Sequence, residues 1–335
     1  MIAFWVGIDV SKRKLDVAAL DERSKLKTHV FANDAKGHAQ LVPWLQGRGL
    51  RPDNAHICLE ATGPYSESLA IVLADGGWPV SVVNPAQVKG FAQSELSRNK
   101  TDRADAALLA RFCAAMRPAL WQPPAPEYRH LRALVDRLQA LKDMHQQETN
   151  RLEAHRFTGQ DDLVASVQQH LDWLRTSIEA LQRQIDDHID GHPTLRRDAE
   201  LLQSIPGVGD VTIAKVLAYI GDVRRFRNAK ALAAFIGVTP RLRLSGTSVK
   251  GRTMLSRTGH PTMRHALYMP GLVALRHNPA IRTFGERLRA TGLAPKAVVG
   301  AAMRKLVHLI FGVIRSGRPF DASMAIRTLD LQDGI

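Results

Sequence analysis

The sequence predicts an α/β domain followed by an all-α region, and three observations indicate this order. Strand-like and helix-like segments alternate over residues 1–117, a stretch with four prolines in ten residues follows at 118–127, and beyond it the segments are helical. Three early strands followed by alternating strands and helices are typical of a mixed sheet of about a hundred residues. We therefore expect a sheet domain, a stiff linker and helical domains, in that order.

Each element of the first domain has a local signal. Strands are expected at Phe4–Asp9, Leu15–Leu20, Thr28–Phe31, His56–Glu60 and Pro79–Val83, with a polar SKRK turn between the first two. Helices are expected at Gly37–Gln46, Tyr65–Ala74 and Thr101–Met116. Gly63-Pro64 opens the second of these helices, because proline is tolerated in a first turn. Asn84-Pro85 ends the fifth strand.

Residues 128–200 predict paired helices. Val167, Leu171, Leu174, Ile178, Leu181 and Ile185 form a heptad seam, and Leu131, Leu134, Leu138 and Leu141 form a shorter one, with a turn at Thr158-Gly159-Gln160 between them. The two helices could pair inside one chain. Pairing between chains is the interpretation we favour, because the seam is long and no obvious third helix covers it.

A third region, residues 201–320, is helical and precedes a polar tail at 321–335. Its IPGVG turn lies between two apolar helices, and Gly207 and Gly209 would allow a tight hairpin whose amides point at an anion. This resembles a helix-hairpin-helix element, which grips a phosphate backbone without reading bases. A plain turn between helices is the alternative, and the basic RRFRNAK that follows favours the DNA interpretation.

The first domain carries acids at the ends of its elements. Asp9 and Glu60 end two strands, and Asp102 and Asp105 lie three residues apart at the start of a helix. Four converging carboxylates would repel unless divalent cations lay between them. Mg²⁺, or Mn²⁺, prefers such oxygen ligands, and two ions about 4 Å apart can stabilise phosphodiester exchange. Each acid alone could instead be a cap or an ordinary first-turn residue.

A Gly-, Ser- and Thr-rich basic segment follows the helical turn. Ser245 stands among Arg241, Arg243, Lys250, Arg252 and Arg257, which are candidate nucleic-acid contacts. A serine hydroxyl needs a base, a metal or dense positive charge to attack phosphate. From composition alone, Ser245, Thr247 and Ser248 are better interpreted as residues that bind phosphate or cap turns.

Composition indicates the partner. The 335 residues carry a net charge of +14, and the segment from Thr239 to Arg318 holds 15 Lys and Arg against one acid, Glu286, so it accounts for the whole surplus. Such a surplus predicts a polyanion, and nucleic acid is the default. The N-terminal apolar run reaches Asp9 too soon for a signal peptide, and Ala297–Ile314 is expected to be a core helix, so neither a membrane protein nor a secreted protein is expected.

The two cysteines, Cys58 and Cys113, have no spacing typical of zinc or of a disulfide framework. A reducing compartment is therefore favoured, and we expect a cytoplasmic protein that acts on DNA at the nucleoid.

The order of strand-Asp, strand-Glu and helix-Asp-x-x-Asp resembles the ribonuclease-H-like nucleases, in particular the RuvC-type resolvases. With IPGVG, LSGTSVKGRTMLSRTGH and ALYMP added, nearly the whole chain resembles the transposases of insertion-sequence family 110, most closely its 1111 subgroup.

The resemblance implies a RuvC-like DEDD domain, a coiled coil and a transposase domain. It implies that Asp9, Glu60, Asp102 and Asp105 bind metal, and that Ser245, or Ser248 beside it, attacks DNA and forms a phosphoserine. It further implies a structured non-coding guide RNA, the bridge RNA, and assembly as a dimer or tetramer.

We therefore expect a DNA recombinase that excises and inserts a mobile element by strand exchange, with a site assembled across two chains as a further hypothesis. A hydrolytic junction-type nuclease that uses the tetrad and water is one alternative. A non-enzymatic nucleic-acid-binding protein with structural acids is the other.

Overall fold

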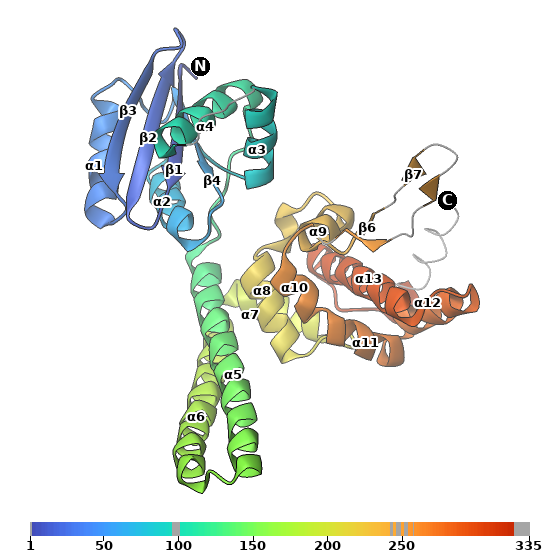
Figure 1. Cartoon of the computed structure of the whole chain (residues 1–335). Helices are drawn as coiled ribbons and strands as arrows, with labels where there is room; N and C mark the ends of the chain where they lie inside the picture. Colours follow the sequence, from blue (N-terminus) through green and yellow to red (C-terminus); the bar gives the residue numbers. More distant parts are fainter. Residues whose placement is uncertain are drawn as a thin grey trace. The chain divides into compact units, whose positions relative to one another are not determined.

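The computed structural model divides the chain into two compact units, Met1–Pro123 and Pro124–Ile335 (Figure 1). It describes residues 2–95, 101–241, 244–245, 249–250, 254–256 and 258–324, without the side chains of Pro64 and of residues 244, 245, 249 and 250. The boundary between the units falls inside the proline-rich stretch at 118–127.

The first unit contains the mixed sheet that the sequence predicts. Its strands are β1 (Phe4–Val10), β2 (Lys14–Asp21), β3 (Leu26–Ala32), β4 (Ala55–Glu60) and β5 (Val80–Val83). They lie in the order β3-β2-β1-β4-β5. The β1–β2 and β2–β3 pairs are antiparallel, whereas β4 is parallel to both β1 and β5. The carboxyl ends of β1 and β4 therefore meet at one edge of the sheet.

Helices cover both faces of this sheet (Figure 1). They are α1 (Ala35–Gln46), α2 (Pro64–Asp75), α3 (Pro85–Ser94) and α4 (Asp102–Met116). Helices α1 and α2 pack with the sheet in one apolar cluster, and α3 and α4 pack in another on the opposite face. The sequence analysis missed α3, because Asn84-Pro85 also starts a helix: the Asn84 side chain accepts from the amide of Ala86 at 2.8 Å, and Pro85 occupies the first turn.

Glycine at position 7 allows α4 to lie directly on the central strand. A Cβ at Gly7 would stand 2.1 Å from the carbonyl oxygen of Ala106 and 2.3 Å from the amide nitrogen of Ala110. Ala106 and Ala110 are buried, so small residues on both elements create this backbone-to-backbone approach. The approach brings the start of α4 to the end of β1.

The second unit begins with a long helical hairpin of α5 (Pro126–Thr158) and α6 (Asp161–Gly191). Gly159 ends α5 in the left-handed conformation, at the turn that the sequence predicts. The α6 seam packs against α5 of the same chain, where Leu141, Leu174 and Leu181 are buried together. Our preference for pairing between chains is therefore corrected, because a seam partner is present within the chain.

The base of the hairpin belongs to the core of a helical bundle. The remaining helices are α7 (Pro193–Gln203), α8 (Asp210–Ile220), η1 (Val223–Arg225), α9 (Ala229–Ile236), α10 (Pro261–Ala266), α11 (Tyr268–His277), α12 (Pro279–Ala290) and α13 (Pro295–Ser316). Leu131 of α5 and Ile189 of α6 share one apolar cluster with α7–α13. The Lys215 Nζ donates to Gln139 Oε1 at 2.8 Å and further ties α8 to α5.

Helix α13 is the one helix, among the described residues, that is long and apolar enough to cross a membrane by length and composition alone. Over half of its apolar stretch is buried in the bundle, and Ala302 and Leu306 have no exposed surface. This burial agrees with the core helix expected at Ala297–Ile314.

Short strands interrupt the helical region, which the sequence analysis expected to lack strands. They are β6 (Pro240–Arg241), β7 (Leu244–Ser245), β8 (Val249–Lys250) and β9 (Met254–Leu255). Strand β6 pairs with β9 and β7 with β8, both antiparallel, and we call these four paired strands the arm. Gly237 and Gly259 fix its base, since a Cβ on Gly259 would meet the Gly237 nitrogen at 2.6 Å.

Candidate active site

Asp9 and Glu60 lie side by side at one edge of the sheet. Ile8 on β1 is paired with Leu59 on the parallel strand β4, and the two acids are the next residue of each strand. Both side chains are half-buried. Parallel strands end at the same edge, which is why acids far apart in the sequence approach each other here.

The start of α4 brings two more acids to this edge. Thr101 caps the helix by accepting from the amide of Ala104 at 3.2 Å, and Asp102 and Asp105 follow in its first turn. Both interact electrostatically with Asp9. The four acids that the sequence singles out therefore lie near one another, with Asp9 interacting with the other three.

A fifth acid, Asp16, completes the cluster, and the sequence analysis missed it. It is paired with Asp9 across the β1–β2 ladder and is buried, with 6% of its surface exposed. One oxygen each of Asp9, Asp16 and Asp102 lie within 4.8 Å of one another. The signal was present, because the turn closed by Ser11 and Lys14 sets the register that places residue 16 opposite residue 9.

Asp9 is held in an unusually unfavourable environment for an anion. Burial, followed by the charges of Asp105, Asp102, Asp16 and Glu60, raises the pKa of Asp9 to about 6. Neighbouring carboxylates with raised pKa values are typical of functional sites. A cation bound beside Asp9 would stabilise its ionised form.

One cation of the chain itself already lies in the cluster. The Lys14 Nζ lies 2.6 Å from Asp102 Oδ2 and 3.1 Å from Asp16 Oδ2. Its hydrogen bond lowers the pKa of Asp102, and the bonds to Asp102 and Asp16 raise the pKa of Lys14. The sequence analysis did not single out Lys14 either.

The donor set suits a divalent cation of the magnesium kind. All the converging groups are carboxylates, which are the ligands that Mg²⁺ and Mn²⁺ prefer. The raised pKa of Asp9 and the ammonium between Asp16 and Asp102 show that positive charge is favoured at this edge. The residues present therefore fit the group that the sequence predicts.

The serine segment lies in the other unit. Ser245 is on β7, opposite Val249 of β8, and Lys250 is opposite Leu244. Arg241 is exposed on β6, whereas Arg243, Arg252, Arg257 and the alternative Ser248 lie outside the described residues. The backbone pairing places Ser245 on the hairpin arm.

The IPGVG turn joins α7 to α8 as expected, but only one of its glycines needs to be glycine. Gly207 has φ of 101°, and a Cβ there would meet Ala274 of α11 at 3.0 Å. Gly209 has an ordinary φ of −103° and open space around it. Asp210 is exposed in the first turn of α8, which opposes an anion at that helix start.

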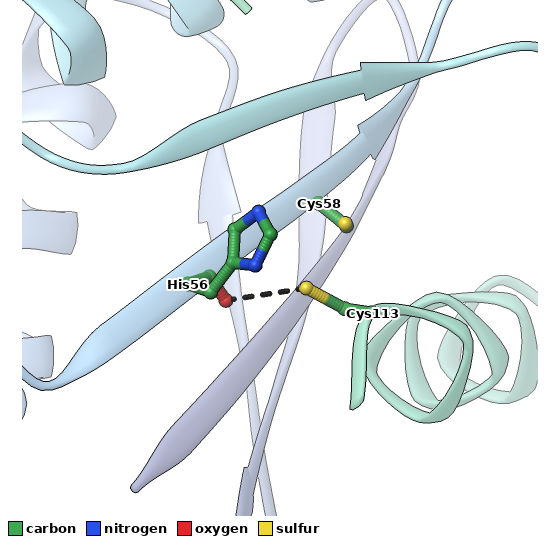
Figure 2. Close-up of side chains that lie close together, drawn as sticks. All are labelled: His56, Cys58 and Cys113. Atoms are coloured by element: carbon green, nitrogen blue, oxygen red, sulfur yellow. Dashed lines mark hydrogen bonds between the residues drawn. The ribbon is translucent and has the colours of Figure 1, made fainter. Parts of the chain in front are cut away.

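A second cluster lies behind the acidic edge, in the core between β4 and α4. His56, Cys58 and Cys113 bring their ligand atoms within 4.8 Å of one another (Figure 2). The Ser81 hydroxyl donates to the carbonyl of Ala119 at 2.9 Å, so His56 Nε2 donates to Ser81 Oγ at 2.7 Å.

Cys113 donates from Sγ to the carbonyl of His56 at 3.5 Å (Figure 2). Its hydrogen bond with Cys58, together with burial, raises the pKa of the Cys113 thiol, which therefore stays protonated. With the Cys113 thiol protonated and only three donors among the described residues, this cluster is a hydrogen-bonded core contact. It joins the strand that ends at Glu60 to the helix that begins at Asp102.

A mixed sheet with acids of β1, β4 and α4 gathered at one edge fits the class of ribonuclease-H-like DEDD proteins that the sequence analysis expects. Comparisons with known proteins agree with this class. A family model described as "Transposase", for DEDD transposases of the IS110 type, matches residues 6–155, and one described as "Transposase IS116/IS110/IS902 family" matches residues 199–286.

Relatives support the same assignment along the chain. A pilin gene-inverting protein of Moraxella bovis is 34% identical over 323 residues, covering 95% of this chain and 97% of the relative. The transposase for insertion sequence element IS1111A of Coxiella burnetii is 25% identical over 297 residues, covering 81% and 78%. The chain belongs to the IS110/IS116/IS902 family of transposases.

Proposed function

We propose that this transposase excises and inserts a mobile DNA element by strand exchange through a covalent phosphoserine. The observation that carries the proposal is the convergence of Asp9, Asp102 and Asp105 near Glu60, in a chain whose second unit carries Ser245 on the paired strand β7. The family assignment supplies DNA recombination as the class of reaction.

The acids of the sheet edge would hold Mg²⁺ or Mn²⁺. Asp9, Glu60, Asp102 and Asp105 are the proposed ligands, and a bound divalent cation would polarise the scissile phosphate and stabilise its negative charge. The chain's own contribution is to hold these oxygens together: β1 and β4 position the first two acids, and the Gly7 contact holds α4.

Ser245 would be the nucleophile. A bond forms between Ser245 Oγ and phosphorus while the bond from phosphorus to one DNA end breaks, and the departing DNA hydroxyl takes a proton. A hydroxyl from another strand later reverses this exchange, and the serine regains its proton. No net phosphodiester bond is lost, which is what strand exchange requires.

Exposed positive charge on the second unit would hold the DNA. Arg276, Arg282 and Lys296 are exposed on α11, α12 and at the start of α13, in the segment that holds the whole charge surplus. With Arg241, Arg243, Lys250, Arg252 and Arg257 of the arm, they would contact phosphates. Phosphate binding by a helix-hairpin-helix element at Gly207 and Gly209 is part of the proposal. The negative charge of Asp210 would weaken this phosphate contact.

Three further proposals are a structured guide RNA that pairs with target and donor DNA, assembly as a dimer or tetramer, and action in the cytoplasm at the nucleoid. Sequencing the RNA that co-purifies with the protein tests the first. A single discrete RNA species from the element is the expected result, and a random sample of cellular RNA would contradict it.

Trapping of a covalent adduct tests the central proposal. The full chain is incubated with end-labelled element DNA and Mg²⁺, and is denatured before electrophoresis. We expect a protein-linked DNA band that disappears in Ser245→Ala and persists in Ser248→Ala. Recombination without any adduct would contradict the serine mechanism.

Ser245→Ala and a further variant, Asp9→Ala, separate the two alternative functions. A hydrolytic nuclease would cleave junction DNA with Ser245→Ala as well as with the unchanged protein, and would form no adduct. A non-enzymatic DNA-binding protein would behave identically with Asp9→Ala in every DNA transaction.

A further inference from the structure

Lys14 lies among the carboxylates that the proposed function assigns to the metal. Its Nζ is 2.6 Å from Asp102 Oδ2, although Asp102 is a proposed metal ligand. A cation that is already bound to a ligand oxygen competes with any second cation for that oxygen. Lys14 therefore affects how strongly a metal ion binds here.

Lys14 has a second partner, Asp16, which lies outside the proposed DEDD tetrad. Lys14 and Asp16 are two residues apart on β2, so their side chains leave the same face of the sheet, and Nζ lies 3.1 Å from Asp16 Oδ2. Asp16 is buried, whereas the Asp102 side chain is about half exposed. If Lys14 leaves Asp102, it can remain paired with Asp16, so the move leaves no ammonium without a partner.

The turn before β2 fixes where this lysine can reach. Ser11 accepts from the Lys14 amide with its Oγ at 3.2 Å, and its own amide donates to the Lys14 carbonyl at 3.0 Å. The backbone of Lys14 is thereby held two ladder positions from the Asp9–Asp16 pair. Lys12 lies in the same turn, and its side chain is exposed.

We propose that Lys14 is a built-in counter-ion that holds Asp102 in the metal-free protein and gives it up when a divalent cation binds, with Asp16 as the partner that retains the lysine. The inference rests on the proposed metal-binding function. It makes Lys14 and Asp16 positioning residues that set the metal affinity of the site, outside the DEDD tetrad itself.

Mn²⁺ binding to the full chain tests this, with the free ion measured by electron paramagnetic resonance. Lys14→Met should bind Mn²⁺ about threefold to fivefold more tightly, the range expected for one exposed ion pair. Lys12→Met, which removes the same charge from the same turn, should change the dissociation constant far less.

Two variants of Asp16 should change the Mn²⁺ affinity in opposite directions. Asp16→Asn leaves Lys14 with Asp102 alone, so Mn²⁺ should bind more weakly. The double variant Lys14→Met/Asp16→Asn should again bind more tightly than the unchanged protein, which excludes a new ligand role of Asp16 as the cause of the tightening.

The outcomes separate this inference from the function on which it rests. If the unchanged protein binds no Mn²⁺, the metal-binding function itself is wrong. If it binds Mn²⁺ but Lys14→Met binds equally or less tightly, or Lys12→Met tightens binding as much, the counter-ion proposal is overturned. Circular dichroism of each variant without metal verifies that the sheet domain is folded.

Discussion

Asp9 and Asp16 are direct partners across the antiparallel ladder of β1 and β2, and both side chains reach the same acidic edge. Two carboxylates in this position repel each other, and Asp16 contributes to the raised pKa of Asp9. The pair shows that the edge is assembled at a cost in stability, which a bound cation can offset.

The first prediction concerns pH. In the folded chain the pKa of Asp9 is raised to about 6, whereas the unfolded chain releases this proton near the ordinary aspartate pKa of 3.8. Between these values the folded state binds more protons, so the contribution of Asp9 to stability falls as the pH rises and is fully unfavourable above about pH 6. Asp9→Asn should therefore melt at a higher temperature than the unchanged metal-free protein at about pH 7. The difference should shrink as the pH falls and vanish only below the unfolded pKa of 3.8, at about pH 3. An equal difference at about pH 7 and about pH 3 would contradict the assignment.

Gly7→Ala should displace α4 and with it Asp102 and Asp105. The new Cβ would stand 2.1 Å from the Ala106 carbonyl oxygen, a backbone atom that cannot rotate away. We expect a loss of about 1–3 kcal/mol or more in the free energy of unfolding, together with weaker Mn²⁺ binding. Urea unfolding and Mn²⁺ titration measure both. Gly90→Ala is the control, since a Cβ in that part of α3 meets no atom within 4 Å.

The cysteine contact should stabilise the junction of β4 and α4. Cys113→Ala removes a buried thiol and its bond to the His56 carbonyl, and should cost about 1–3 kcal/mol in unfolding free energy. Since Cys58 and Cys113 interact with each other, the double alanine variant should cost less than the sum of the single variants. Additive losses in urea unfolding would show that the two thiols are independent core residues.

Salt dependence should locate the nucleic-acid surface. Changing Arg276, Arg282 and Lys296 to Gln should weaken DNA binding and reduce the slope of log affinity against log salt by about 0.9 per lost phosphate contact. The matched control changes three exposed arginines of the helical hairpin, Arg137, Arg156 and Arg183. An equal loss in both triple variants would mean that only net charge matters.

Mixing of inactive subunits should show whether one site uses two chains. The tetrad and Ser245 lie in different units of the chain, so Asp102→Asn and Ser245→Ala subunits carry complementary defects. We expect strand exchange to return partly when the two are mixed and co-assembled. Each variant alone should stay inactive. No recovery in the mixture would indicate that every chain completes its own site.

Local chemistry in the sequence was enough for much of the fold. The five strands, the alanine-rich helix α4 and the turn at Gly159 follow from short-range patterns of apolar residues, glycine and proline. The order of Asp9, Glu60 and Asp102 along the elements identified the acidic edge for the same reason, since acids at strand ends and helix starts gather where these ends meet.

The sequence by itself thus determined most strands and helices, apart from α3 and the short strands β6–β9, together with where the charge surplus lies and which acids could bind a metal. Only the tertiary structure decided which further residues join these acids and which helix covers the heptad seam. The register of the β1–β2 hairpin places Asp16 and Lys14 in the site, and the α6 seam packs against α5 of the same chain. The physical reason is that periodicity fixes which face of an element is buried. Its partner depends on contacts between residues far apart in the chain.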